Sequence, residues 1–192
     1  MSTIDSPFSI DEIKLLFETK GNKLYGESIN QVEHALQCAQ LAEDSGAEPS
    51  LIIAALLHDV GHLQHRDSVS AFKQGIDDAH ELIGAKFLVS RLGPYVSEPV
   101  RLHVDAKRYL CSVDKGYWDI LSVQSKQTLE IQGGPMKDGE AQRFAENPHA
   151  NAAISLRKWD DIGKQPNQQT QSLDHFLEIT EKYFQMISSQ KK

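Results

Sequence analysis

The chain has 192 residues, of which 40% are hydrophobic and 24% are charged, and its formal net charge is -7. This length is sufficient for one domain with a substantial core, whereas the acidic balance argues against a general nucleic-acid binder. No apolar run reaches membrane-spanning length. Residues 1–5 do not resemble a signal peptide, and Cys38 and Cys111 lie in apolar sequence, so we expect reduced thiols in a cytoplasmic protein.

The first part of the chain contains helical patterns separated by turn residues, and sustained β-alternation is absent throughout. A capping box at residues 9–12 predicts a helix that ends at Gly21. A loop carrying Tyr25 and Glu27 follows. A second capping box at residues 30–33 opens a helix that carries His34 and ends near residue 46.

The next predicted helix begins at Pro49, is apolar from 51 to 57, and leads to His58 and Asp59 side by side. Burying an imidazole and a carboxylate beside leucines is costly unless a positive partner is present. We expect Gly61 to break this helix and residues 62–75 to form a loop at the mouth of a site. His62 lies one turn from His58 and shares its face.

The remaining predicted helices add further polar residues. A helix over residues 77–92 has His80 in its first turn, where the helix dipole should keep the imidazole neutral. The next, over residues 99–111, places His103 and Lys107 one turn apart. Residues 114–145 are predicted to be irregular with short helices, and they include Ser125 and Thr128.

The last two predicted helices begin at Asn147 and after Ser172. The first of them carries Arg157, Asp160 and Asp161, and Arg157 and Asp160 are neighbours on its surface. The second is amphipathic and should cover the core.

The histidines and carboxylates together suggest a metal centre. A series of His34, His58–Asp59, His80, His103 and Asp160 supplies six ligands, enough for two octahedral ions that share a carboxylate. Imidazole and carboxylate without thiolate suit iron, manganese or zinc. The alternatives are a chance His–Asp pair at a surface helix end and a satisfied core histidine at position 34. Asp161 competes with Asp160 for the ligand role.

Two cations accompany these candidate ligands. A lysine beside a metal ligand is unexpected because the ion repels it, but an anionic substrate between Lys107 and the metal would explain its position. The alternatives are a lysine that extends from the helix into solvent and an ordinary intrahelical ion pair between Arg157 and Asp160.

These stretches resemble the HD-domain superfamily, and more closely its mixed-valent di-iron oxygenases, which include myo-inositol oxygenase and the organophosphonate-cleaving dioxygenases. The likeness extends from Tyr25 to Lys164. It is strongest at residues 54–62, 103–111, 133–136 and 156–161. The His–Asp pair alone is unspecific, whereas the stretches His-x3-Lys-Arg-Tyr-Leu and Arg-x-Trp-Asp-Asp are far more specific.

The resemblance implies an all-α HD-domain helical bundle with a di-metal site in its core. It implies one domain over residues 1–192, with a core at about 25–164 and a covering helix at about 172–188. The cofactors implied are two iron ions (Fe²⁺/Fe³⁺), with O₂ as cosubstrate and Asp59 as the bridging ligand. The implied iron ligands are His34, His58, Asp59, His80, His103 and Asp160.

The resemblance also implies substrate-binding residues. Lys107 and Arg157 would bind a phosphonate with help from Ser125 and Thr128. His62 would touch the substrate and, with Lys107, act in catalysis. Tyr25 and Glu27 would form a lid, in which Glu27 could receive a substrate ammonium.

The activity implied is oxidative cleavage of the carbon–phosphorus bond of a small 1-hydroxyalkylphosphonate, giving a carboxylic acid and inorganic phosphate. Candidate substrates are 2-amino-1-hydroxyethylphosphonate, its trimethylammonio analogue and hydroxymethylphosphonate. The alternatives are a metal-dependent HD-type phosphohydrolase acting on a nucleotide or other phosphate ester, and a scaffold or sensor that binds without turnover. We expect no nucleic-acid or membrane partner, and a monomer or weak homodimer.

Overall fold

The computed structural model describes residues 9–22, 29–64 and 76–190. Within these ranges the chain forms helices joined by turns and contains no β-strand, which confirms the all-α class. The helices are α1 (Ile10–Lys20), α2 (Gln31–Asp44), α3 (Pro49–Leu57), α4 (Val60–Gln64), α6 (His80–Leu92), α7 (Pro94–Val113), α8 (Tyr117–Ile120), α9 (Val123–Ile131), α10 (Asp138–Ala145), α11 (Ala150–Ile162) and α12 (Leu173–Ser189). None of these described helices combines the length and apolarity needed to cross a membrane.

Helix α3 lies at the centre of the fold and is the most apolar helix. Pro49 occupies its first turn, where the missing N–H has no intrahelical partner in any case. Its residues from Ile53 to Leu57 are at most 1% exposed, because α2, α7, α11 and α12 all pack against it. This helix therefore carries His58 directly into the interior.

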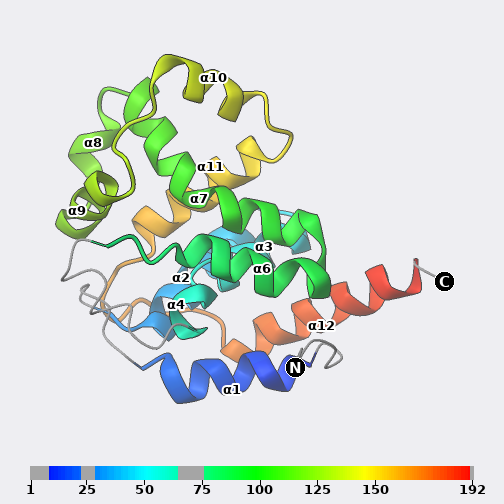
Figure 1. The fold of residues 1–192 in the computed structure, drawn as a ribbon. Coiled ribbons are helices and arrows are strands. Elements are labelled where there is room, and N and C mark those ends of the chain that lie inside the picture. Colours follow the sequence, from blue (N-terminus) through cyan, green and yellow to red (C-terminus); the bar gives the residue numbers. More distant parts are fainter. Residues whose placement is uncertain (1–8, 23–28, 65–75, 191–192) are drawn as a thin grey trace.

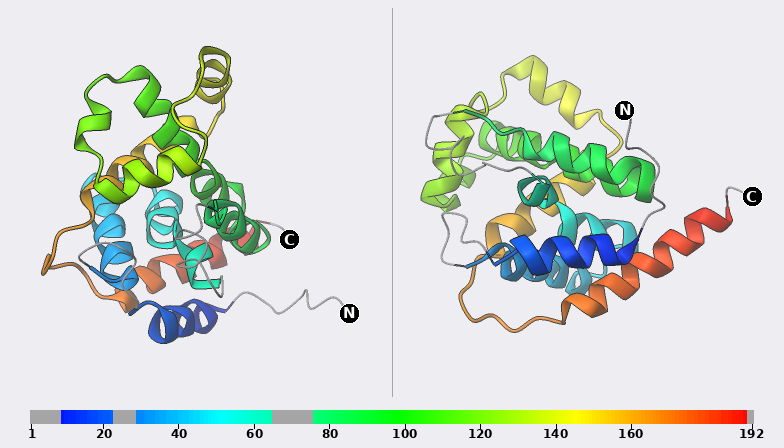
Figure 2. Two further views of the ribbon diagram at one scale, coloured as in Figure 1. Left: turned by 60° about the vertical axis from the view of Figure 1, so that its left-hand side comes forward. Right: turned by 60° about the horizontal axis from the view of Figure 1, so that its bottom comes forward.

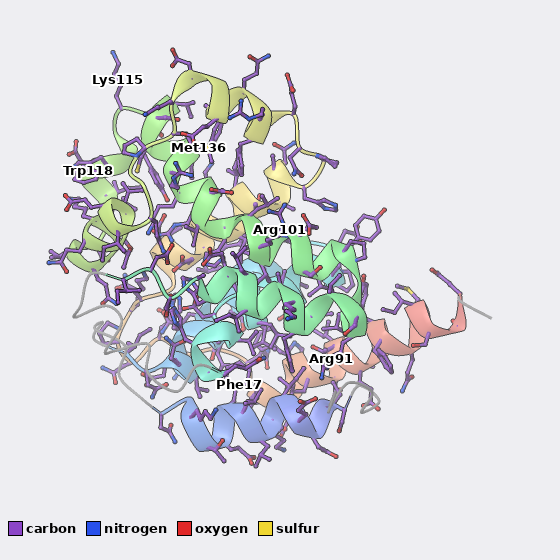
Figure 3. The ribbon with its side chains drawn as sticks, viewed as in Figure 1. Phe17, Arg91, Arg101, Lys115, Trp118 and Met136 are labelled. Carbon is purple, nitrogen blue, oxygen red and sulfur yellow. The ribbon has the colours of Figure 1, made fainter. Side chains whose placement is uncertain are left out.

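The outer helices cover opposite ends of this core. Helices α1 and α12 lie at one end and α10 at the other, with α3, α6 and α7 between them (Figures 1 and 2). Phe17 of α1 points toward the core, whereas Lys115 projects away from it (Figure 3). The long helix α7 packs against both α6 and α11, so it connects the two sides of the molecule.

The chain around His58 differs from the sequence expectation. Helix α3 ends at Leu57, His58 is its C-cap, and the chain turns before α4 begins at Val60. Gly61 lies inside α4 and does not end a helix. His62 is buried in the same short helix rather than exposed in a loop. The physical reason is a close approach, because a Cβ at Gly61 would lie 2.0 Å from the carbonyl oxygen of His80.

We expect Gly61→Ala to lower the free energy of unfolding by about 2–4 kcal/mol, because its Cβ meets backbone that cannot move without shifting α6. Urea unfolding measures the effect. Gly116→Ala is the matched control, since the nearest atom to its Cβ would be at 3.6 Å. Equal urea midpoints for the two variants would contradict the close-packing explanation.

Other helix boundaries also differ from those predicted from the sequence. Helix α6 begins at His80, later than expected, and α7 begins at Pro94 and continues through Pro99. Pro99 sits near the amino-terminal end of α7 and removes only one backbone donor there. Helix α11 begins at Ala150, because the Asn147 side chain caps His149 N instead of opening the helix itself. The second capping box and the Ser172 cap are confirmed.

Candidate metal centre and anion pocket

Four histidines from four parts of the chain meet in the interior. His34 lies on α2, His58 ends α3, His80 begins α6 and His103 lies on α7. All four are at most 8% exposed. They form two pairs, with Nε2 atoms 3.2 Å apart in the His34–His58 pair and 3.2 Å apart in the His80–His103 pair.

The other ring nitrogens of these histidines are already engaged. His34, His58 and His103 place Nδ1 2.7, 2.9 and 2.6 Å from backbone carbonyl oxygens. A carbonyl only accepts, so each Nδ1 carries the hydrogen and each neutral ring offers a lone pair at Nε2. Two lone pairs facing each other at 3.2 Å require a cation or a proton between them.

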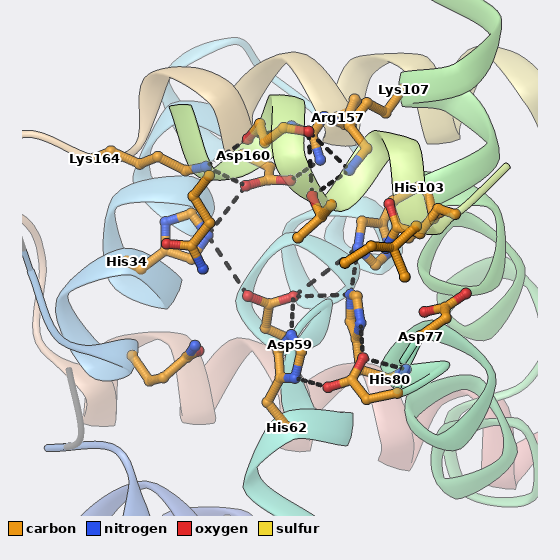
Figure 4. Close-up of a pocket in the computed structure, with 18 of the residues that line it drawn as sticks. His34, Asp59, His62, Asp77, His80, His103, Lys107, Arg157, Asp160 and Lys164 are labelled. Atoms are coloured by element: carbon orange, nitrogen blue, oxygen red, sulfur yellow. Dashed lines mark hydrogen bonds and ion pairs between the residues drawn. The ribbon is translucent and has the colours of Figure 1, made fainter. Parts of the chain in front are cut away.

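The Asp59 carboxylate lies between His34 on one side and His80 and His103 on the other (Figure 4). Its Oδ1 is 3.5 Å from His58 Nε2, 3.6 Å from His80 Nε2 and 3.9 Å from His103 Nε2. Its Oδ2 is 3.8 Å from His34 Nε2. One carboxylate is therefore within reach of both pairs, which is the position of a bridging ligand.

These separations fit two metal ions. Neighbouring ligands of an octahedral ion stand roughly 3 Å apart when each is about 2.1 Å from the metal. The His34–His58 pair with Asp160 would hold one ion, and the His80–His103 pair would hold the other. Asp59 would serve both. The donor set contains only nitrogen and oxygen, which suits iron, manganese or zinc.

The structure separates the two adjacent aspartates. Asp160 Oδ1 lies 3.2 Å from His34 Nε2. The carboxylate of Asp161 turns the other way and accepts hydrogen bonds from Tyr117 and Arg157. Only Asp160 of the two thus reaches the histidines.

The protonation of the cluster shows how strongly it favours positive charge. Burial lowers the pKa of His80, but Asp78, Asp59 and Glu81 outweigh it and raise the pKa to about 9. In the metal-free protein these three carboxylates thus act against the helix dipole, which favours the neutral imidazole at this position. The pKa of His103, its partner, is held well below the ordinary value by burial and by His80. A bound metal ion would take the place of the proton that this pair shares.

The His34–His58 pair likewise contains one histidine with a raised pKa and one with a lowered pKa. Burial opposes protonation of His34, but Cys38 and Asp160 raise its pKa well above the ordinary value. Burial lowers the pKa of His58. Burial would also raise the pKa of the Asp59 carboxyl, but the imidazoles around it lower that pKa. The centre is therefore an anionic carboxylate among imidazoles that share protons.

Three cations lie on the Asp160 side of the centre (Figure 4). Lys107 is 2% exposed, and its Nζ donates to Thr128 Oγ1 at 2.8 Å and to Ser125 O at 3.5 Å. In the described part of the chain no carboxylate lies within ion-pair distance of this nitrogen. Burial and the neighbouring Arg157 lower the pKa of Lys107 to about 7. The Lys107 ammonium is thus buried without a carboxylate to balance its charge among the described residues.

Arg157 is placed differently. Its guanidinium donates to Asp160 Oδ2 at 2.7 Å, to Asp161, and to Ser125 Oγ at 3.3 Å. Its positive charge is therefore matched by two carboxylates. Arg157 holds Asp160 in place and lines the pocket that Lys107 also lines.

The pocket joins the metal centre to these cations. Asp59, His62, His80 and His103 line one side, and Lys107, Ser125, Thr128, Arg157 and Lys164 line the other. The predicted site residues of the described ranges thus lie at one pocket or directly behind it, as His58 does. Tyr25 and Glu27 lie outside the described residues.

Sequence reasoning missed three residues at the site. Lys164 Nζ is 3.5 Å from Asp160 Oδ1, and its spacing of four residues from Asp160 on a predicted helix was a usable signal. Tyr117 buttresses Arg157 through its hydroxyl. Asp78 contacts two histidines. For Tyr117 and Asp78 the sequence offered no signal.

Arg108 connects two of the stretches in which the resemblance is strongest, residues 103–111 and 133–136. It follows Lys107 on α7 but faces away from the centre, and its Nε donates to Gly134 O at 3.0 Å. Gly133 and Gly134 have φ of 98° and 72°, a backbone region that favours glycine. Arg108 thus anchors the turn after α9, the helix that carries Ser125 and Thr128.

Fold and site together define an all-α protein with a buried histidine–carboxylate centre beside a cationic pocket. The HD domain family matches residues 32–148. A hydroxymethylphosphonate dioxygenase from Gimesia maris is 46% identical over 151 residues, covering 78% of this chain and 75% of that protein. The [1-hydroxy-2-(trimethylamino)ethyl]phosphonate dioxygenase (glycine-betaine-forming) from Leisingera caerulea is 35% identical over 168 residues, covering 87% and 86%. The chain belongs to the HD-domain family, in its phosphonate dioxygenase branch.

Proposed function

We propose that this chain is a metal-dependent dioxygenase that cleaves the carbon–phosphorus bond of a small 1-hydroxyalkylphosphonate. The products would be a carboxylic acid and inorganic phosphate. The observation that carries this proposal is the buried Lys107 ammonium, which has no carboxylate partner in the described structure and lies beside a centre of six nitrogen and oxygen ligands. The two relatives, both named as dioxygenases of hydroxyphosphonates, support it.

The metal ligands proposed are His34, His58, Asp59, His80, His103 and Asp160, with Asp59 as the bridge. Two iron ions in the Fe²⁺/Fe³⁺ state, when bound there, would supply the redox chemistry with O₂. The separations between the ligand atoms support two ions, and the resemblance to mixed-valent oxygenases supports iron.

The side chains around the pocket bind and orient the substrate. Lys107 donates to the phosphonate, and the hydroxyl groups of Ser125 and Thr128 add neutral donors next to it. Arg157 lines the same pocket and holds the Asp160 carboxylate and the Ser125 hydroxyl in place. The charge match selects a compact dianion, and the apolar packing behind the histidines excludes water from the far side of the centre.

We assign His62 to the carbinol side of the substrate. Its Nε2 lies 3.9 Å from Asp59 Oδ1, and the side chain lines the pocket. We assign it to the substrate hydroxyl, as a proton acceptor or as a hydrogen-bond partner at Nε2.

Among the candidate substrates, hydroxymethylphosphonate is favoured. The described residues that line the pocket include no tryptophan, tyrosine or phenylalanine. Aromatic faces are the usual partners of a trimethylammonium group. The more similar of the two relatives is named for hydroxymethylphosphonate.

Phosphorus NMR on the iron-loaded protein tests the function. We expect inorganic phosphate to appear from hydroxymethylphosphonate in air and its formation to stop when oxygen is removed. The 2-amino-1-hydroxyethyl and trimethylammonio compounds are run in parallel, with nucleotide monophosphates as the control for a phosphohydrolase. Release of phosphate from a nucleotide without oxygen, and none from any phosphonate, would overturn the proposal.

Three further expectations remain predictions. They are a single domain over residues 1–192, a cytoplasmic location, and a monomer or weak homodimer in solution. Size-exclusion chromatography with light scattering tests the oligomeric state directly.

A further inference from the structure

A second carboxylate, Asp78, contacts two histidines of the site at once. Its Oδ1 accepts from His80 Nδ1 at 2.9 Å, and its Oδ2 lies 2.8 Å from His62 Nδ1, an ion-pair distance. The Asp78 side chain is only 9% exposed. His62 and His80 come from different helices, so this carboxylate joins α4 to the start of α6.

The two imidazole rings are aligned with each other. Their centroids are 3.9 Å apart and their planes differ by 20°. With both Nδ1 atoms facing Asp78, both Nε2 atoms face Asp59, at 3.9 Å for His62 and 3.6 Å for His80. Figure 4 shows the two histidines beside Asp59 on the side away from Lys107.

The backbone is bent to make this contact. Ala79, between Asp78 and His80, has φ 49° and ψ 37°, a left-handed conformation that is costly for a residue with a Cβ. This bend turns Asp78 back against the ring of His80. Asp77 supports the bend, because its Oδ1 accepts from Ala79 N at 3.2 Å. Strain of this kind at a pocket points to a functional constraint.

We propose that Asp78 is a positioning residue that orients two histidines with different tasks, His80 on the metal side and His62 on the substrate side. At His80, a carboxylate that accepts from Nδ1 fixes the ring, directs the Nε2 lone pair inward and makes it a better donor to a cation. At His62, the 2.8 Å contact with Asp78 Oδ2 and the stacked His80 ring restrict the orientation of the ring. The His62 part rests on the proposed function. The His80 part rests only on metal binding.

Cobalt binding tests the His80 part without turnover. The full-length metal-free protein is titrated anaerobically with Co²⁺ and followed by its visible absorption. Because an amide offers one acceptor where the carboxylate offers two, we expect Asp78→Asn to weaken one of two Co²⁺ sites by about 10–100-fold. Asp77→Asn is the control; it removes the same charge one residue away, and an amide oxygen can still accept from Ala79 N. Its Co²⁺ affinity should stay within about twofold of the parent protein.

A double-mutant cycle tests the His62 part. At saturating iron, Asp78→Asn should lower kcat/KM for hydroxymethylphosphonate in the parent protein, but add no further loss in a His62→Ala background. The Co²⁺ defect should persist in both backgrounds, because it acts through His80. Thermal unfolding followed by circular dichroism checks the fold, and if Asp78→Asn does not fold, Asp78→Ser is compared with Asp77→Ser.

The possible outcomes separate the two proposals. Equal Co²⁺ affinity for the Asp78 and Asp77 variants would overturn the positioning role at His80. A kcat/KM loss that is just as large in the His62→Ala background would overturn the role at His62. If no variant, nor the parent protein, turns over a phosphonate while Asp78→Asn still weakens Co²⁺ binding, the proposed function fails and the His80 part stands.

Discussion

Asp59→Asn is expected to abolish turnover, with kcat falling by roughly a thousandfold or more, and to leave at most one metal ion per chain. Asp59 is the carboxylate that lies within 3.9 Å of Nε2 atoms from both histidine pairs. An amide at this position has the same shape but no negative charge, and its nitrogen cannot bind a cation. The variant therefore loses the bridge while keeping the packing around it.

Metal analysis and phosphate release measure the two effects separately. Asp44→Asn serves as the control, because this carboxylate is exposed at the end of α2 and, among the described residues, accepts a hydrogen bond from Gln40 alone. We expect it to retain two ions and full activity. An Asp59→Asn protein that keeps two ions and turns over within about tenfold of the parent protein would contradict a bridging role.

Thermal unfolding of the metal-free Asp59→Asn protein tests separately how much the Asp59 charge contributes to stability. The imidazoles around Asp59 lower the pKa of its carboxyl in the folded state, so its charge contributes stability above the unfolded pKa, and this stability is lost as pH falls. The metal-free variant should therefore be less stable than the parent protein at neutral pH. This difference should shrink in acid.

Most of the centre was predictable from the sequence because its signals are local. The apolar run of α3 leads directly to His58 and Asp59, and the spacing of His103 and Lys107 and the pairing of Arg157 with Asp160 each appear within one helix. Local pattern is enough to place such residues on a common face. The all-α class followed from the same periodicity.

The missing parts depend on contacts between segments that are distant in sequence. The sequence predicts that Gly61 ends a helix, whereas the structure requires glycine there because the backbone of His80 approaches it closely. That contact draws His62 into the interior, where the sequence suggested a loop. Asp78 contacts His62 because Ala79 adopts a left-handed conformation. An alanine gives no indication of this conformation in the sequence.

The second carboxylate partner of Arg157 and the surroundings of the Lys107 ammonium could not be predicted from the sequence. The sequence placed Lys107 and Arg157 in one substrate clamp, but it could not show that two carboxylates already neutralise Arg157. Nor could it show that Lys107 is buried against hydroxyl and carbonyl oxygens. This difference makes Lys107 the more sensitive test of the anion pocket.

Lys107→Met is expected to lower kcat/KM for the phosphonate by roughly 30- to 5000-fold without changing the metal content. Removing one partner of a buried, hydrogen-bonded charge pair costs about 2–5 kcal/mol, and each 1.36 kcal/mol is tenfold in rate. Methionine fills a similar volume without the charge. Arg101→Met is the control, because this cation lies on the same helix and pairs with Glu98 outside the pocket.

The pH dependence provides an independent signature of the same ammonium. Burial and Arg157 lower the pKa of Lys107 to about 7, so the cation is lost from the free enzyme as pH rises through about 7. We expect kcat/KM of the parent protein to fall over that range and this fall to be missing in Lys107→Met. Arg101→Met should keep it. A pH profile that is identical in Lys107→Met and the parent protein would show that a different group titrates.

Lys107→Met is expected to raise the stability of the metal-free protein although it lowers activity. This combination is expected of a cation whose role is to bind an anion. The lysine is charged in the unfolded chain up to its ordinary pKa of 10.5, whereas burial opposes that charge in the folded protein. The destabilisation of the folded state by the buried Lys107 charge is therefore fully present below about pH 7 and declines as pH rises toward 10.5. Metal-free Lys107→Met should therefore unfold at a higher temperature than the parent protein below pH 7. Inorganic phosphate should reduce this difference in unfolding temperature, because it stabilises only the parent protein. A buried ammonium that destabilises the fold until an anion binds is a binding group and not a structural one.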